Sequence, residues 1–206
     1  MSYRTTGLGD DPVAFNEGTS LLVSGASMTV QERVYDVLGG ANDDEETAIL
    51  ISTDRGVADV VRSFQERGAF DAGRLGVIDC TGRDGPESVQ GAPVRRLGSP
   101  GDLTGMSLEF AKLVDRFEDA GAGDRARVGL ATVSTVLMYT DVRTAFRFLH
   151  VFTSRIRSGG LFGIFAMDPG MHDQQTVNTV RAVFDCEARI DDDGDVDLRG
   201  SGFRTA

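Results

Sequence analysis

The stretch from Leu21 to Glu32, LLVSGASMTVQE, indicates the class of fold. It begins as an apolar run typical of a buried strand, continues through a turn of small residues, and then starts a helix that leads to an apolar face at Val34, Val37 and Leu38. A strand that passes through a short turn into a helix is the opening unit of an α/β domain. In nucleotide-binding α/β domains the phosphate-binding loop occupies this turn.

The turn matches the phosphate-loop pattern G-x-x-x-x-G-K-[ST] at its first position only. Gly25 takes the first glycine, whereas Val30, Gln31 and Glu32 stand at the second glycine, the lysine and the hydroxyl residue. Glutamine brings no charge to the β- and γ-phosphates, and a glutamate replaces the hydroxyl that helps to hold Mg²⁺. Two interpretations follow: a nucleotide-binding scaffold that has lost its phosphate site, or an ordinary turn between a strand and a helix.

Composition restricts the classes of partner. The chain has 206 residues, a net charge of -11, 40% apolar residues and a single lysine, Lys112, among its 21 basic residues. This bias toward acids and arginine is typical of proteins from salt-loving archaea, and it disfavours broad binding to nucleic acid. Cys80 and Cys186 lie in apolar runs and are expected to be buried thiols of a cytoplasmic protein. No stretch has the length and apolar character of a membrane helix or of a signal peptide.

The hydrophobic pattern predicts strands alternating with helices. Residues 1–17 are expected to be a loose lead-in, and residues 18–206 to form a single domain with a long irregular loop at 82–102. Strands are predicted at 20–24, 47–53, 74–81, 126–133 and 161–167, helices at 30–38, 57–67, 103–120, 141–158 and 174–184, and a closing hairpin at 186–190 and 196–199. This alternation predicts a three-layer α/β domain with a mainly parallel central sheet. Leu108 and Val151 are expected on the inward faces of their helices.

Three stretches together resemble the KaiC-like ATPases of the RecA superfamily, of a haloarchaeal type, over roughly residues 15–200. The run through Gly25 is similar to the family's Walker A strand and loop, and the run from Ala48 to Asp54 to its second strand with an acidic pair. The run from Arg127 to Leu137 is similar to its Walker B strand and the hydroxyl-rich turn that follows. The resemblance implies a RecA-like P-loop fold with the terminal β-hairpin.

The resemblance also marks where the catalytic residues of that family are replaced. Gln31 and Glu32 stand at the Walker A lysine and hydroxyl, and Ala131 stands at the Walker B aspartate. Of the acidic pair that activates water, Thr53-Asp54 keeps one acid, so Asp54 is the one candidate residual catalytic acid. A remaining phosphate loop would comprise Gly25, Ala26, Ser27, Met28 and Thr29.

Two other clusters have competing interpretations. Asp168, His172 and Asp173 follow the predicted fifth strand and could hold a metal ion, but Asp173 as the cap of the next helix, with His172 exposed, is favoured. The acidic run 191–195 lacks the glutamate and the flanking helices of an EF-hand and is interpreted as a hairpin turn. We therefore predict no metal site.

The sequence predicts a RecA/KaiC-like domain that has lost ATPase activity and acts as a regulatory or protein-interaction module, with signalling as one setting. It would carry no cofactor and would work with a protein partner or as a homo-oligomer. One alternative is a switch that still binds ATP or ADP in an altered phosphate loop. Another is a Rossmann-like enzyme such as a methyltransferase, in which Asp54 would hold a ribose. The strand order separates this last alternative from the others.

Overall fold

A computed structural model describes all residues except 1, 10, 42–45, 68–70, 122–124 and 206. Within these residues the main sheet has nine strands in the order β11-β10-β3-β9-β8-β4-β5-β7-β6. Parallel pairing runs from β10 to β7, while β11 and β6 pair antiparallel at the two edges. The strands are β3 (Ser20–Ser24), β4 (Thr47–Ser52), β5 (Leu75–Asp79), β6 (Ser88–Val89), β7 (Ala92–Arg96), β8 (Ala126–Leu130), β9 (Phe162–Met167), β10 (Cys186–Ile190) and β11 (Val196–Gly200).

The strand order decides between the two predicted fold families. β3 and β4, the first two strands of the repeating pattern, are separated in the sheet by β9 and β8. In the common Rossmann order the first strand lies directly beside the second. The Rossmann-like alternative is therefore wrong, and the fold is RecA-like, with β10 and β11 forming the expected terminal hairpin.

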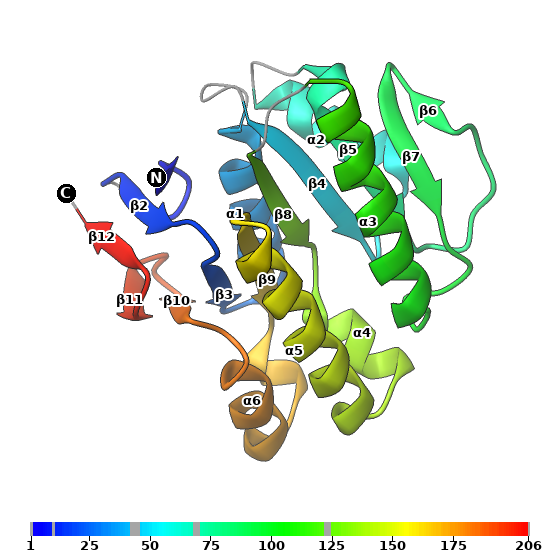
Figure 1. Cartoon of the computed structure of the whole chain (residues 1–206). Helices are drawn as coiled ribbons and strands as arrows, with labels where there is room; N and C mark the ends of the chain where they lie inside the picture. The colour runs from blue at the N-terminus through cyan, green and yellow to red at the C-terminus, as the bar shows by residue number, and fades with distance from the viewer. Residues whose placement is uncertain (1, 10, 42–45, 68–70, 122–124, 206) are drawn as a thin grey trace.

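Two sets of helices cover the two faces of the sheet (Figure 1). Side chains alternate across β3, so Leu21 and Val23 join the core beneath α1 and α2, whereas Leu22 joins the core beneath the other helices. The result is the predicted three-layer architecture. Its helices are α1 (Ser27–Gly39), α2 (Val57–Glu66), α3 (Leu103–Asp119), α4 (Val133–Tyr139), α5 (Val142–Ser158) and α6 (Gln174–Arg181), with short 3₁₀ turns η1 (Ala72–Arg74) and η2 (Pro169–Met171).

The structure corrects the prediction after β8. The predicted strand over 126–133 ends at Leu130. The helix α4 begins at Val133, the last residue of that predicted strand, and continues through the segment that was expected to be a turn. β-branched residues in this segment favour a strand by propensity, but Val133 and Val136 are buried together at helical spacing. The Thr132 side chain accepts a hydrogen bond from the Thr135 backbone N–H at 3.4 Å and so caps the helix.

Two apolar residues lie on the outer faces of their helices. Leu108 is 54% exposed and Val151 is 49% exposed, although both were expected to face the core. On α3 the buried positions recur at three- and four-residue spacing on the opposite side of the helix, and they are Leu103, Met106, Phe110, Leu113 and Phe117. The predicted inward face of α3 included Leu108, which lies outside the stripe of residues that the structure buries.

The first residues of the chain differ from the expected loose lead-in. β1 (Ser2–Thr5) and β2 (Val13–Asn16) form a small sheet with β12 (Phe203–Thr205), in the order β1-β2-β12. Tyr3 and Phe15 are fully buried and stack on Phe162 of β9, and the Tyr3 hydroxyl donates to the Gly160 carbonyl at 2.9 Å. β1 and β2 are each only four residues long, so their alternating patterns are too short to stand out from the polar residues around them.

A buried ion pair fixes the end of the sheet at which the central strands β4 and β8 begin. Arg127 is fully buried, and its Nε donates to the Glu46 carboxylate at 2.5 Å, while its other nitrogens donate to the Val37 and Arg4 carbonyls, both at 2.7 Å. Arg125 contacts the second Glu46 oxygen at 2.6 Å. One guanidinium thereby joins β8 to β1, to α1 and to the residue before β4.

We predict that Glu46→Gln lowers the free energy of unfolding by about 3–5 kcal/mol, because it leaves a buried guanidinium without its counter-charge. Denaturant unfolding followed by circular dichroism measures the change. The matched control is Asp197→Asn, which breaks an exposed ion pair with Arg199 and should cost about 0–1 kcal/mol. Equal, small effects in both variants would show that the buried pair is not a structural constraint.

Candidate functional site

The candidate site lies where the parallel strands end, because helices and loops converge at that edge. β3 stops at Ser24 and α1 starts at Ser27, so only Gly25 and Ala26 separate them. Of the predicted phosphate-loop residues, Ser27, Met28 and Thr29 already belong to the first turn of α1. Met28 is 76% exposed there, and Val30 is buried in the core. The segment that would wrap around a phosphate in the pattern is helical in this chain.

Gly25 is required by the packing of its own turn. A Cβ atom at this position would lie 2.7 Å from the Ile190 carbonyl oxygen at the end of β10 and 3.3 Å from the Val30 side chain. The Gly25 backbone N–H donates to the Met167 carbonyl at 3.3 Å. The glycine at the first pattern position therefore lets three neighbouring strand ends approach one another closely.

We predict that Gly25→Ala destabilises the protein by about 1–3 kcal/mol, since the added methyl group overpacks the contact with Ile190. Thermal or denaturant unfolding measures the effect. Gly98→Ala is the control, because a Cβ there meets nothing within 4 Å and the change should stay within about 0.5 kcal/mol. If Gly25→Ala were neutral, the glycine would have to be explained by a ligand instead.

The two residues at the Walker A positions bind other parts of the same protein. The Gln31 amide donates to the exposed Asp54 carboxylate at 3.0 Å. Glu32 accepts from Arg55 at 3.3 Å and forms a second ion pair with Arg67. Thus Gln31, at the Walker A lysine position, binds Asp54, the one remaining acid of the catalytic pair. Glu32, at the Walker A hydroxyl position, is bound by two guanidinium groups. We call Gln31, Glu32, Asp54, Arg55 and Arg67 the α1–α2 clamp.

An aromatic ring supports the clamp from below. Tyr35 is fully buried, and the guanidinium carbons of Arg55 and Arg67 each lie 5.4 Å from its ring centre. Arg67 also donates to Asp36 at 2.8 Å and to the Ser63 carbonyl at 2.9 Å. Burial raises the pKa of Tyr35 to about 12, so its hydroxyl stays neutral. The clamp is a packed, charge-balanced contact between two helices.

Hydroxyl groups join the neighbouring strand ends. Ala131, at the Walker B aspartate position, is buried and offers no metal ligand. The Thr53 hydroxyl faces the Thr132 carbonyl at 3.5 Å, and the Ser134 hydroxyl accepts from the Asp168 backbone N–H at 3.1 Å. These contacts connect the ends of β4, β8 and β9 through uncharged groups, where an ATPase of this fold would place a metal-binding acid.

The cluster at 168–173 acts mainly as a pair of caps. The Asp173 side chain accepts from the Thr176 backbone N–H at 2.8 Å, which confirms its predicted role as the cap of α6, and Asp168 caps η2 through Gly170 at 2.9 Å. His172 is half-buried rather than exposed, and burial lowers its pKa. In the described part of the chain no three His, Cys, Asp or Glu side chains gather as a metal site would require.

Sequence reasoning did not identify the arginine half of the clamp. Arg55 and Arg67 flank α2, and neither belongs to a catalytic pattern. A signal was present, since Glu32 and Asp36 place two acids on one face of α1 at i, i+4 spacing, which favours cations on a neighbouring element.

None of the helices in the described part of the chain combines the length and apolar character of a membrane span.

Comparisons with known proteins agree with the fold. The model of a family of unknown function, DUF7504, matches residues 18–190. A comparison with curated proteins gives no match. Among solved structures, the crystal structure of a KaiC-like protein from the hyperthermophilic archaeon Pyrococcus horikoshii OT3 is similar with a TM-score of 0.62 and 11% identity, over 93% of this chain and 83% of that one. At this identity the likeness shows the fold alone.

Proposed function

The chain belongs to the DUF7504 family of unknown function, and we propose that it is a RecA/KaiC-like domain without ATPase activity that acts as a regulatory or protein-interaction module. The observation that carries the proposal is the α1–α2 clamp. Gln31 and Glu32 stand at the positions that bind phosphate and Mg²⁺ in ATPases of this fold. Here Gln31 binds Asp54, and Glu32 binds Arg55 and Arg67 of the same chain.

The chemistry of phosphoryl transfer supports the proposal. That reaction is catalysed almost wholly by positioning and by charge stabilisation, which a lysine, a metal ion and an acid supply. Here Gln31 is uncharged, Ala131 cannot bind a metal, and Glu32 would repel a phosphate. Asp54, the one candidate acid, receives a hydrogen bond from the Gln31 amide at 3.0 Å.

A second candidate function is a nucleotide-binding switch that does not hydrolyse its ligand. It is favoured by the first turn of α1, where Ala26 provides no side-chain cap. The backbone N–H groups of that turn and the helix dipole would favour an anion such as the phosphates of ATP or ADP. The carboxylate of Glu32 opposes it on the next turn, although two arginines balance that charge.

The module is expected to work in an assembly, either with another protein or with copies of itself. We infer a cytoplasmic setting, because Cys80 and Cys186 are both buried free thiols rather than a disulfide. Signalling is one pathway that we propose for the module. Burial raises the pKa of each thiol to about 12, so neither is a nucleophile at neutral pH.

We predict that millimolar Mg-ATP or Mg-ADP leaves the midpoint of thermal unfolding unchanged. A ligand at 100 times its dissociation constant would add about 2.7 kcal/mol, which corresponds to roughly 5–10 °C for a chain of this size. Differential scanning fluorimetry in 0.15 M and in 2 M KCl measures the midpoint, with S-adenosylmethionine as an unrelated ligand.

A concentration-dependent shift with either nucleotide would contradict the first proposal and support the switch. Phosphate release from Mg-ATP would contradict both, and Asp54→Asn would then test whether the remaining acid is responsible. The matched control is Asp59→Asn, which removes a carboxylate from the exposed side of α2, where it pairs only weakly with Arg62 at 3.3 Å.

A further inference from the structure

An open groove lies between α3 and α5, the two long helices on one face of the sheet (Figure 1). Its volume is about 320 Å³. Leu103 and Phe148 are each only 8% exposed and form its floor, whereas Val151 is 49% exposed on its rim. The remaining lining residues are Thr104 and Ser107 of α3 and Thr144 and Arg147 of α5. We call this surface the α3–α5 groove.

The two helices are linked to each other on both sides of the groove. Tyr139, shortly before α5, lies against Gly101, shortly before α3, because a Cβ atom on Gly101 would be 3.4 Å from the Tyr139 Cβ. Further along both helices, Nη1 of Arg155 donates to the Ser107 carbonyl at 3.2 Å. The lining residues therefore form one continuous surface between two fixed walls.

The helix that forms one wall is basic, although the chain as a whole is acidic. α5 contains four arginines and neither aspartate nor glutamate, whereas the chain has a net charge of -11. Arg157 pairs with Asp185, and Arg155 is bound to α3 as described above. Arg143 and Arg147 are exposed one turn apart, and neither forms an ion pair with any residue that the structure describes.

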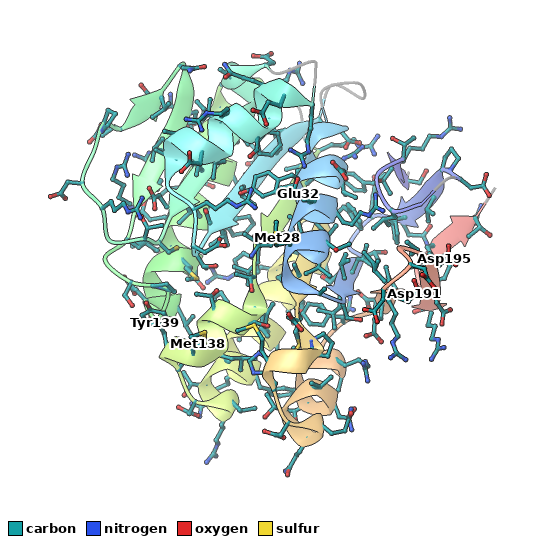
Figure 2. The ribbon with its side chains drawn as sticks, turned by 180° about the vertical axis from the view of Figure 1, so that it is seen from behind. Met28, Glu32, Met138, Tyr139, Asp191 and Asp195 are labelled. Carbon is teal, nitrogen blue, oxygen red and sulfur yellow. The ribbon has the colours of Figure 1, made fainter. Side chains whose placement is uncertain are left out.

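The acids nearest along the chain are already in use. Asp102 and Asp141 precede the two helices and cap them, accepting from the backbone N–H groups of Gly105 at 2.8 Å and Thr144 at 3.0 Å. None of the described lining residues is acidic. Figure 2 shows the opposite side of the molecule with Glu32 on α1, where two arginines balance that carboxylate. The free cations are thus particular to α5.

We propose that the α3–α5 groove binds an acidic amphipathic segment of a partner protein. This rests on the proposed function, because it names the partner of the interaction module. Apolar side chains of the segment would contact Val151 and the floor of the groove, and its carboxylates would pair with Arg143 and Arg147. Charge complementarity selects this occupant, because these two cations have no counter-charge within the described part of the chain.

Other occupants fit the charges less well. The net charge of -11 repels the phosphates of nucleic acid and the surface of an anionic bilayer, and two free arginines offset little of that repulsion. A second copy that docked through the same surface would bring Arg143 and Arg147 of both chains together. A short acidic segment instead places its carboxylates at the two arginines alone.

The test is fluorescence anisotropy of a labelled 18-residue peptide of leucine and glutamate at helical spacing, titrated with the full chain in 0.15 M KCl. Binding in the micromolar range is expected, and it should weaken in 2 M KCl because salt screens the ion pairs. A peptide of the same composition with its leucines dispersed around the helix is the control. It should bind severalfold more weakly.

The electrostatic half has its own variant. Arg143→Glu/Arg147→Glu should weaken binding of the acidic peptide at least tenfold, because both cations become repulsive. The matched control is Arg62→Glu/Arg199→Glu, which changes the net charge equally at two exposed arginines of α2 and β11. It should change binding less than twofold, since charges beyond about 8 Å are screened at this salt concentration.

The apolar half is tested without any change of charge. Thr104→Trp fills the groove and should weaken binding severalfold, and Val151→Ser should do the same by removing an apolar contact. Met28→Ser is the matched control, because it removes an exposed apolar side chain from α1 on the opposite face of the sheet (Figure 2). It should leave binding unchanged. Circular dichroism checks the fold of each variant.

Four outcomes would overturn the inference. The first two are no binding of the acidic peptide by the wild-type chain, and equal weakening by the two arginine variants. The third is tighter binding of phosphatidylglycerol vesicles or of single-stranded DNA than of the peptide, lost in Arg143→Glu/Arg147→Glu. The fourth is self-association by analytical ultracentrifugation that the same variant abolishes, which would assign the groove to a second copy. Nucleotide-induced thermal shifts test the proposed function separately, so either idea can fail while the other stands.

Discussion

The pair between Arg127 and Glu46 is the constraint on which the rest of the architecture depends. Burying a guanidinium and a carboxylate costs several kcal/mol each, and only a complete set of partners offsets that cost. Arg127 obtains its partners from β1, the end of α1 and the residue before β4. The pair thus restricts how β1, α1 and β4 can be placed around β8, because another arrangement would leave a buried charge without its partners.

Most of the architecture was predictable because its signals are local and repeated. Buried strands of five or six apolar residues, each followed by a helix, predicted the three layers, and the order of three weak patterns predicted a RecA-like arrangement. What escaped prediction depends on contacts between distant residues. The two N-terminal strands gain their stability from Phe162, and α4 forms because its valines are buried, against their propensity.

The site was predictable in its losses and not in its replacements. Sequence could show that Gln31, Glu32 and Ala131 lack the charges that phosphate and metal require. It could not show that Arg55 and Arg67 pair with Glu32, because an arginine on an acidic chain rich in arginine has many possible partners. Likewise, Met28 looked like part of a loop, and its exposure became evident only once α1 was seen to begin at Ser27.

The position of β3 in the sheet has a consequence for how the chain is made. Both of its neighbours, β9 and β10, come from the last quarter of the sequence. At ribosomal speed, roughly 140 more residues take on the order of ten seconds to synthesise, and during that time LLV of β3 has neither edge paired. The apolar centre of the sheet therefore pairs only once β9 and β10 have been made, and the nascent chain must keep β3 soluble until then.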